Sequence, residues 1–275
     1  MDVLDVLDVL DVPGRLARAR GNRKGHLTML LQQIFNYIAD PANDFGTETL
    51  ITLEYTLIPL VLCILIAVPL GVLVAPNAVA AFLAANVSGA ARAIPTIAFL
   101  AAAIPLLGIG FNPTVVALTL LGIPPILLNT VAGLRAIDPA ALEAGRGMGM
   151  TRWQVLARVQ IPLVLPVIAA GVRTSGVQIA ATTPLAGLIG GRGYGDYIFF
   201  ALAYPLFTAT ALAPLLIGAV GVAALALLTE VGLGAVQRAV TPAGLRLRDT
   251  AETPETGGGG PAQPGGEPGG KLAAA

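Results

Sequence analysis

The sequence is short of the residues on which most enzymes and secreted domains depend. Of its 275 residues one is cysteine, Cys63, and one is histidine, His26. A single cysteine excludes a disulfide or a thiolate metal cluster within one chain, and a single histidine in the polar N-terminal region weakens any site built on histidine. Charged residues make up only 12%, whereas a soluble domain carries roughly 25%. The chain therefore has too little charge to cover a water-facing surface.

Hydrophobic residues make up 55% of the chain and gather in continuous runs. About 20 helical residues cross a hydrocarbon core about 30 Å thick, and five runs reach that length. They lack the period-two alternation of a membrane β-barrel. We therefore expect an all-α membrane protein with five spans, at 51–75, 82–107, 113–134, 163–190 and 206–233.

Both ends of the sequence differ from this apolar core. Residues 1–49 carry a threefold Asp-Val-Leu repeat, a basic stretch at 15–24 and the segment "HLTMLLQQIFNYI". This region is expected to be a variable extension, either lying on the membrane surface or forming a plain tail. Residues 239–275 are rich in glycine and proline and are predicted to form a disordered tail. The transmembrane domain is then expected to cover residues 50–238.

Arginine is distributed unevenly between the ends of the expected spans, and this predicts the orientation of the chain. If residues 135–160 are cytoplasmic, five spans place the C-terminus on that side too. The cytoplasmic side then collects Arg92, Arg135, Arg146, Arg152, Arg158, Arg238, Arg246 and Arg248. The opposite side holds Arg192, Asp196, Asp40, Asp44 and Glu48. The basic stretch at 15–24 falls on this opposite side as well, against the usual bias.

One short stretch between the third and fourth spans is not apolar. It reads "DPAALEAGRGMGMTRWQVLARVQIP" over residues 138–162. Asp138 followed by Pro139 predicts a helix start, because the carboxylate can cap free amides and proline suits the first helical position. Three glycines, Gly145, Gly147 and Gly149, then disfavour further helix and permit a tight turn.

A second helix is predicted to follow this turn. Thr151 and Gln154 have the spacing of a capping box, and Pro162 marks the entry to the fourth span. The segment at 138–160 is too short to cross a bilayer and too polar to lie within one. We expect a helix, a turn and a second helix on the cytoplasmic face, acting as a surface lid, a plain connection or a docking element for a soluble partner.

The chain contains no phosphate-binding motif of its own. No G-x-x-x-x-G-K-[ST] sequence occurs, so the chain is not expected to hold ATP in a P-loop. The glycine-rich "GGRGYG" at 190–195 follows an apolar span rather than a strand and is interpreted as an outer-face turn. Any ATP chemistry would therefore have to come from another polypeptide, and this chain is expected to bind no cofactor or metal and to catalyse no reaction.

The fourth span carries a stripe of small and weakly polar residues on one helix face. Gly171, Thr174, Gln178 and Thr182 recur at helical spacing, and Ser175 lies alongside. Such a stripe suits either tight packing between helices or a wetted translocation path. The sequence leaves both alternatives open.

Arg173 is the most unusual residue of the same span. A guanidinium within a bilayer is costly, so Arg173 is expected to find a carboxylate, carbonyls or water, unless it reaches the cytoplasmic interface. Because Arg173 is itself cationic, a structural or gating role is expected for it. Bent or broken helices are expected at the prolines of the second and third spans, namely Pro95, Pro105, Pro124 and Pro125, with Asn129 nearby.

The stretch at 138–162 resembles the cytoplasmic signature of permease subunits in binding-protein-dependent ABC importers. That signature has E-A-A, three residues, G, nine residues and I-x-L-P. The same positions here are Glu143-Ala144-Gly145, Gly149 and Val159-Gln160-Ile161-Pro162. The departures are mild, with Gly145 for the second alanine, Val159 for isoleucine and Ile161 for leucine.

Wider stretches resemble one branch of this family, the permeases for quaternary-amine osmoprotectants such as glycine betaine, carnitine and choline. They are "AIDPAALEAGRGMGMTRWQVLARVQIPLVLPVIAAGVRT", "LIGGRGYGDYIFFAL" and "GIPPILLNTVAGL", and the resemblance covers roughly residues 50–238. It implies a type I importer permease core in a bacterial plasma (inner) membrane. The implied partners are separate ATPase subunits that bind ATP and Mg²⁺, a second permease copy, an extracytoplasmic substrate-binding protein and lipid, but no nucleic acid.

The resemblance also assigns roles to residues. In the family this segment is a coupling helix that lies in a groove of the ATPase subunit. This implies a coupling site at Glu143, Ala144, Gly145, Arg146, Met148, Gly149, Thr151 and Pro162. A translocation path or gate is predicted at Arg173, Thr174, Gln178, Thr182 and Asn129.

Two alternatives remain beside this interpretation. The first is the same kind of importer for an amino acid or another small solute, since a separate binding protein would do much of the selecting. The second is an ion-driven carrier, which would be expected to have acidic residues at mid-membrane and an inverted repeat. Glu54 and Glu230 are the only membrane-proximal acids, both near the ends of expected spans, and no repeat is found.

Overall fold

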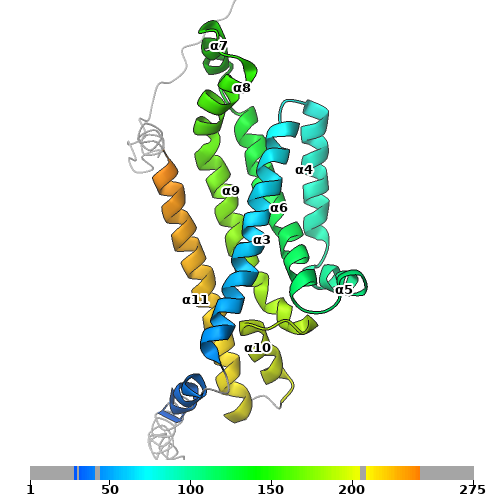
Figure 1. Ribbon diagram of the computed structural model, residues 1–275, viewed down its shortest axis with the longest axis vertical. Helices are drawn as coiled ribbons and strands as arrows, with labels where there is room; N and C mark the ends of the chain where they lie inside the picture. The colour runs from blue at the N-terminus through cyan, green and yellow to red at the C-terminus, as the bar shows by residue number, and fades with distance from the viewer. Residues whose placement is uncertain (1–27, 30, 41–43, 205–208, 242–275) are drawn as a thin grey trace, which may run out of the picture. The chain divides into compact units, whose positions relative to one another are not determined.

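The computed structural model of the chain describes residues 28–29, 31–40, 44–204 and 209–241. Within these residues the regular structure is helical throughout (Figure 1). The Asp-Val-Leu repeat, the basic stretch at 15–24 and nearly all of the expected tail lie outside the described residues. Within the expected N-terminal extension, residues 31–39 are helical, and the helix of the first span already begins at Phe45.

Four helical stretches are long and apolar enough to cross a membrane. They are Phe45–Val74, Phe111–Arg135, Arg152–Ile189 and Ala211–Val240, and a bent helix pair adds a fifth if it counts as one span. They correspond to the helices α3 (Phe45–Val74), α6 (Phe111–Arg135), α9 (Ile161–Thr182) and α11 (Ala209–Val240). The all-α membrane fold predicted from the apolar runs is thus confirmed, with four continuous spans.

The second expected span, at 82–107, is not one continuous helix. It is divided into α4 (Ala78–Ala93) and α5 (Thr96–Leu107), with a bend of 91° between them. Ile94 at the break has an extended backbone (φ −76°, ψ 122°), because the ring of Pro95 disfavours helical angles in the preceding residue. The break at Pro95 is therefore as predicted, whereas Pro105 lies inside α5 without ending it.

The structure corrects the position of Arg92. Asn77 caps the start of α4 by accepting hydrogen bonds from the amides of Val79 and Ala80, and Arg92 lies in the last turn of this helix. Figure 1 shows that this end of α4 points away from α7 (Pro139–Gly147). The prediction that Arg92 shares the side of residues 135–160 is therefore wrong, because the helix begins earlier than the apolar run suggests.

The core lies where α3, α6 and α9 meet. Its fully buried side chains include Cys63 of α3, Ile126 of α6 and Ile179 of α9. A methyl group at Gly122 of α6 would lie 2.6 Å from both Cys63 Sγ and Ser175 Oγ. Ser175 donates a hydrogen bond to the Gly122 carbonyl at 2.8 Å. The missing side chain at Gly122 therefore lets three helices approach closely, as small residues do in membrane bundles.

We expect Gly122→Val to destabilise the bundle, because the buried side chains of Cys63, Ser175 and Ile179 would have to move aside. Overpacking of this kind costs roughly 1–3 kcal/mol, which should lower the thermal unfolding midpoint of the detergent-solubilised protein. Gly232→Val in α11 is the matched control, since a side chain at Gly232 would meet no atom within 4 Å. Equal midpoints for the two variants would contradict the close packing at Gly122.

Candidate coupling segment and candidate transport path

The coupling segment, residues 138–160, begins with the predicted helix. The Asp138 carboxylate accepts a hydrogen bond from the amide of Ala140 at 2.9 Å, and Pro139 occupies the first helical position of α7. The helix ends at Gly147, and Gly149 takes a positive φ of 79° in the turn that follows. Both the capped start and the glycine turn are therefore confirmed.

The second helix begins at the predicted capping box. Thr151 Oγ1 accepts from the amide of Gln154 at 3.4 Å, and Gln154 Oε1 accepts from the amide of Thr151 at 2.8 Å. The helix α8 (Arg152–Val155) then continues through a π-helical turn at Leu156–Gln160 into α9. The start of the second helix is confirmed.

The expectation of a separate second helix is wrong, because α8 is the beginning of the fourth span. The amide of Ile161 donates to the carbonyl of Leu156, five residues back. Pro162 follows at once, and in a regular α-helix its ring would clash with the carbonyl of Arg158. A π-helical turn is a known way to accommodate such an irregularity without ending the helix. Pro162 therefore belongs to the fourth span, beyond the π-helical turn, and not to the exposed tip of the coupling segment.

The tip of the coupling segment presents large apolar side chains to the surroundings. Trp153 is 79% exposed and Met148 is 70% exposed. Charged side chains lie exposed around them: Glu143, Arg146 and Arg152. An exposed tryptophan and methionine with arginines at the rim have the composition of a protein-binding surface.

Gly145 lies on the inner face of α7 and is buried. A methyl group there would meet Val155 Cγ2 at 3.5 Å, Val159 Cγ2 at 3.6 Å and Met150 Sδ at 3.8 Å, which are ordinary contact distances. Ala144, Gly149 and Thr151 are exposed at the same tip. The predicted coupling residues other than Pro162 are thus brought together in one compact element.

We predict that Gly145→Ala stabilises the coupling segment. Alanine loses less backbone entropy than glycine in a helix, a gain of roughly 0.5–1 kcal/mol, and its methyl group fits without a clash. The measurement is hydrogen exchange of the α7 amides, which should slow in the variant. Faster exchange would show that a methyl group at Gly145 does not fit between α7 and the helix that follows it.

Arg173 is paired with a carboxylate on another span. It forms an ion pair with Glu230 of α11 and donates from Nη1 to Gln237 Oε1 at 3.4 Å. The side chains of Arg173 and Glu230 are 40% and 38% exposed. Of the partners expected for Arg173, the structure contains the carboxylate, and the pair makes the site less cationic than the arginine alone suggests.

The position predicted for Glu230 near a span end is wrong. The helix α11 continues to Val240, so ten residues, about 15 Å of helix, separate Glu230 from its end. The apolar run predicted a shorter helix because the segment after Glu230 contains polar residues. The ion pair therefore joins α9 and α11 well inside both helices.

The polar stripe of α9 divides between two environments. Gly171 and Ser175 face α6, where a methyl group at Gly171 would lie 2.9 Å from Asn129 Cβ. Thr174 is exposed and donates to the carbonyl of Ala170 of its own helix at 3.0 Å. One edge of the stripe thus packs against α6, while the other is uncovered in this chain.

Two further predicted path residues, Thr182 and Asn129, form side-chain hydrogen bonds within their own helices. Thr182 Oγ1 donates to the carbonyl of Gln178 at 2.6 Å, and Asn129 Nδ2 donates to the carbonyl of Pro125 at 2.8 Å. Gln178 and Thr182 are half-buried. The structure therefore brings Asn129 to Gly171 and Arg173 to Glu230, but it does not gather all five predicted path residues in one place.

At the end of the bundle opposite α7, a buried carboxylate ties the first span to α10 (Tyr194–Leu202). Glu48 accepts hydrogen bonds from Arg192, one of them at 2.9 Å from Nε, and from the amide of Gly193. Thr52 Oγ1 accepts from the amide of Tyr194 at 2.9 Å. The glycine-rich stretch is thus a turn at this end over residues 190–193, as predicted, whereas Tyr194 and Gly195 already belong to α10.

Sequence reasoning placed Glu48 and Arg192 on the same side of the membrane but missed their contact. The two residues lie 144 positions apart, and each sits at the edge of an apolar run. The available signal was that Glu48 and Arg192 lie on the same side, each at the end of an apolar run, although Asp40, Asp44 and Asp196 share that side. Such a pairing can be suspected once the side of each residue is assigned.

These features define a class of protein: a multi-pass helical membrane subunit with a capped, exposed element between its third and fourth spans. A family model described as "Binding-protein-dependent transport system inner membrane component" matches residues 67–242. The chain belongs to this family. It is thus a multi-pass inner membrane component of an ABC importer, a class whose description implies a separate binding protein and an ATPase.

Three relatives are similar to this chain over nearly the whole of their own length. The chain is 37% identical to the glycine betaine/carnitine/choline transport system permease protein OpuCB of Bacillus subtilis, covering 78% of this chain and 97% of the relative. It is 36% identical to the choline permease OpuBB of the same organism, covering 80% and 99%. It is also 36% identical to the osmoprotectant import permease OsmW of Salmonella typhimurium, covering 77% and 98%.

Among solved structures, the chain is similar in fold to a chain of the MetNI methionine ABC transporter in an inward-facing conformation. The TM-score is 0.65 at 24% sequence identity, covering 74% of this chain and 100% of that chain. At this identity the likeness concerns the fold alone. It agrees with the importer permease core that the resemblance of the sequence implies.

Proposed function

We propose that this chain is the transmembrane permease subunit of an ATP-driven importer for quaternary-amine osmoprotectants such as glycine betaine, carnitine or choline. The observation that carries the proposal is an identity of 36–37% with relatives named for these solutes, over nearly their full length. The fold supports it, since the spans and the coupling segment of a permease are both present.

The complete transporter is proposed to contain further chains. A second permease copy, identical or homologous, would complete the translocation path, and two ATPase subunits would bind ATP and Mg²⁺. A binding protein would deliver the solute at the end opposite α7. The permease itself would make and break no covalent bonds.

We infer that the coupling segment docks in a groove of the ATPase, with Trp153 and Met148 as its apolar anchors. Both side chains are largely exposed in this chain, and buried aromatic anchors dominate the energy of most interfaces. Arg146 and Arg152 beside them favour an acidic rim on the partner. Closure of the ATPase pair on ATP would then pull the segment and tilt α9, which is continuous with it.

The role proposed for Arg173 is to transmit this movement between spans. Its ion pair with Glu230 ties α9 to α11, so the two helices would move as one body when the coupling segment is displaced. Thr174 and Gln178 lie toward the less covered face of α9 and are proposed to line the path together with Thr182. Asn129, which packs beside Gly171, is proposed to hold α6 and α9 together next to it.

The proposal is tested by reconstitution with the ATPase and the binding protein in lipid vesicles. ATP hydrolysis and uptake of labelled glycine betaine, carnitine and choline are measured, with amino acids in parallel. We expect at least one quaternary amine to stimulate both. Stimulation by an amino acid alone would favour the alternative solute class, and uptake driven by an ion gradient without ATP would overturn the importer assignment.

A further inference from the structure

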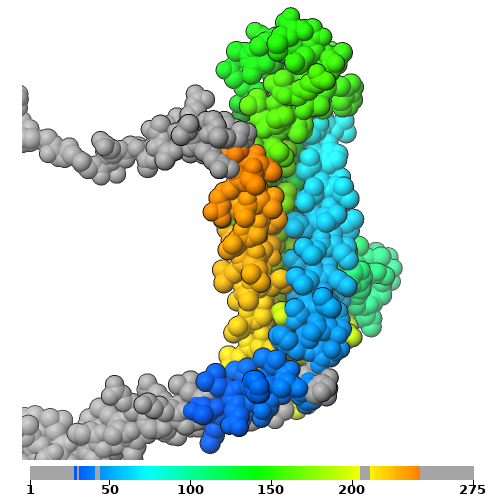
Figure 2. All heavy atoms as spheres, turned by 60° about the vertical axis from the view of Figure 1, so that its left-hand side comes forward, coloured from blue at the N-terminus to red at the C-terminus, as the bar shows by residue number. Residues whose placement is uncertain are grey.

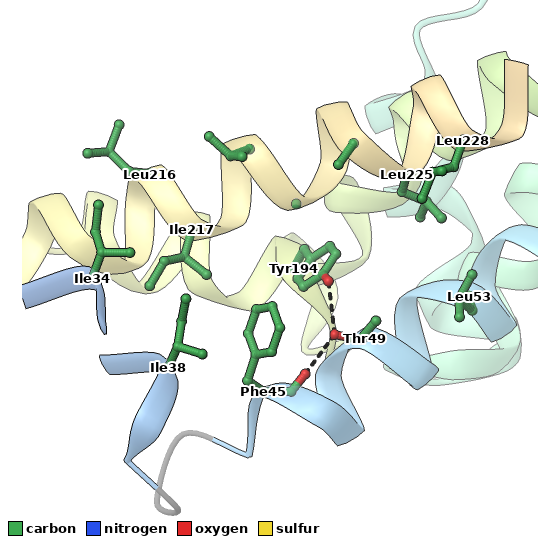
Figure 3. A pocket seen from close by; sticks show the side chains of 13 residues that line it. Ile34, Ile38, Phe45, Thr49, Leu53, Tyr194, Leu216, Ile217, Leu225 and Leu228 are labelled. Atoms are coloured by element: carbon green, nitrogen blue, oxygen red, sulfur yellow. Dashed lines mark hydrogen bonds between the residues drawn. The ribbon is translucent and has the colours of Figure 1, made fainter. Parts of the chain in front are cut away.

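A cavity of about 450 Å³ lies between the helix at 31–39, the first turns of α3, α10 and the first half of α11 (Figure 3). Its size is within the range of small-molecule sites, roughly 300–1,000 Å³. Most of its wall is aliphatic or aromatic, and the residues that form it are Ile34, Ile38, Phe45, Thr49, Leu53, Tyr194, Leu216, Ile217, Val220, Gly221, Ala224, Leu225 and Leu228.

The polar atoms of this wall already have partners. Among the lining side chains, Thr49 and Tyr194 alone are polar. Thr49 Oγ1 donates to the carbonyl of Phe45 at 2.7 Å and lies 2.9 Å from the hydroxyl of Tyr194, so Tyr194 is the donor in that second bond. Figure 3 shows both bonds at the cavity wall. The cavity therefore offers a ligand no unpaired polar side chain.

This chemistry excludes a charged solute as the occupant. A quaternary ammonium could contact the rings of Phe45 and Tyr194, but it would be buried without a carboxylate among the lining side chains. Transferring an unpaired charge into an apolar site is strongly unfavourable. The occupant must be uncharged and apolar.

The shape of the cavity indicates a long, thin occupant. Its α11 wall extends over residues 216–228, a rise of about 18 Å along the helix. That length is close to the depth of one leaflet, about half of a 30 Å hydrocarbon core. A chain lying parallel to α3 and α11 would therefore fit along the wall and end beneath the helix at 31–39.

The cavity wall is continuous with the surface that faces lipid. Val220 and Leu228 line it and are themselves 64% and 70% exposed. Large apolar side chains continue along the exposed faces of both spans, including Leu57 and Leu65 of α3 and Val231 of α11. Figures 1 and 2 show α3 and α11 close to each other at the end of the bundle where the helix at 31–39 lies, whereas α9 lies between them toward the other end. Since the chain is an inner membrane component, hydrocarbon reaches this opening directly.

We propose that the cavity holds one acyl chain of a phospholipid from the leaflet opposite the coupling segment. The chain lies between α3 and α11, and the helix at 31–39 closes the site at the membrane surface. It fills the space that the two spans leave at this end and so supports them when the bundle moves. The site is independent of which solute the transporter carries.

The test uses the full chain in vesicles of phosphatidylethanolamine and phosphatidylglycerol that contain a phospholipid with a photoreactive group midway along one acyl chain. After illumination, labelled peptides are mapped by mass spectrometry. We expect labelling to concentrate on Leu53, Val220 and Leu225. Ala224→Phe fills the cavity and should lose most of this labelling, whereas Ala223→Phe, an exposed neighbour outside the lining, should retain it.

Two results would overturn the proposal. Equal labelling along all exposed faces of the spans, or unchanged labelling in Ala224→Phe, would reduce the site to ordinary surrounding lipid. A photoreactive residue placed at Val220 in the assembled transporter provides a second measurement that does not depend on filling the cavity. We expect it to link to lipid, and a link to a second permease chain would assign the cavity to an interface between copies.

Discussion

A chain with Glu230→Leu is expected to lose transport, and a chain that also carries Arg173→Leu is expected to recover much of it. In the single variant the guanidinium of Arg173 keeps its charge within the span but loses its carboxylate partner. An unpaired charge in such a place destabilises the folded protein far more than the removal of both charges does. The double variant removes both charges and leaves two apolar side chains that α9 and α11 can pack together. Uptake of labelled solute, normalised to the amount of inserted protein, measures the difference.

Glu54→Leu provides the control for this pair of variants. Glu54 is an exposed carboxylate on α3, and its replacement also removes one negative charge from a span. It should leave uptake near that of the unmodified protein. If Glu230→Leu also transports normally, or if the double variant is as inactive as the single one, then the ion pair between α9 and α11 does not transmit movement.

Gly149→Val is expected to abolish solute-stimulated ATP hydrolysis while the permease still inserts in the membrane. Gly149 has φ of 79° in the turn between α7 and α8, and a residue other than glycine held in such a conformation costs roughly 1–3 kcal/mol. Valine is among the least tolerant residues there, because its branched Cβ crowds the backbone. The turn would open, and α7 would no longer pack over Val155 and Val159.

The matched control is Gly147→Ala, two residues earlier. Gly147 is helical, and a methyl group there would meet no atom within 4 Å, so stimulated hydrolysis should be retained. Membrane insertion is followed by the yield of folded, detergent-soluble protein. Normal stimulation in Gly149→Val would mean that the coupling segment binds its partner without this turn, and the docking proposal would fail.

Local features of the fold could be predicted from the sequence with good accuracy. The Asp138 cap, the Thr151–Gln154 capping box and the break at Pro95 each depend on a few neighbouring residues, and the structure contains all three. The existence of the apolar spans was also predictable, because hydrocarbon thickness sets the minimum length of an apolar run that crosses the membrane, but their ends were not. Such features follow from backbone chemistry that acts within one or two helical turns.

Features that depend on packing between distant segments could not be predicted. A carboxylate was one of the partners expected for Arg173. Identifying it as Glu230 required knowing that α11 extends to Val240 and faces α9. The contact of Glu48 with Arg192 joins residues far apart in the chain. The 91° bend after α4 was likewise not predictable in size, since Pro95 breaks the helix but the packing of α5 sets the angle.

The unbroken helical run from Arg152 to Ile189 has a mechanical consequence. Its 38 residues correspond to a rod about 57 Å long, with the tip of the coupling segment at one end and the Gly190 turn at the other. If such a rod pivots near its middle, the two ends swing by similar amounts in opposite directions. A lever of this kind would convert a pull on the coupling segment into an opposite displacement at the Gly190 end of the span.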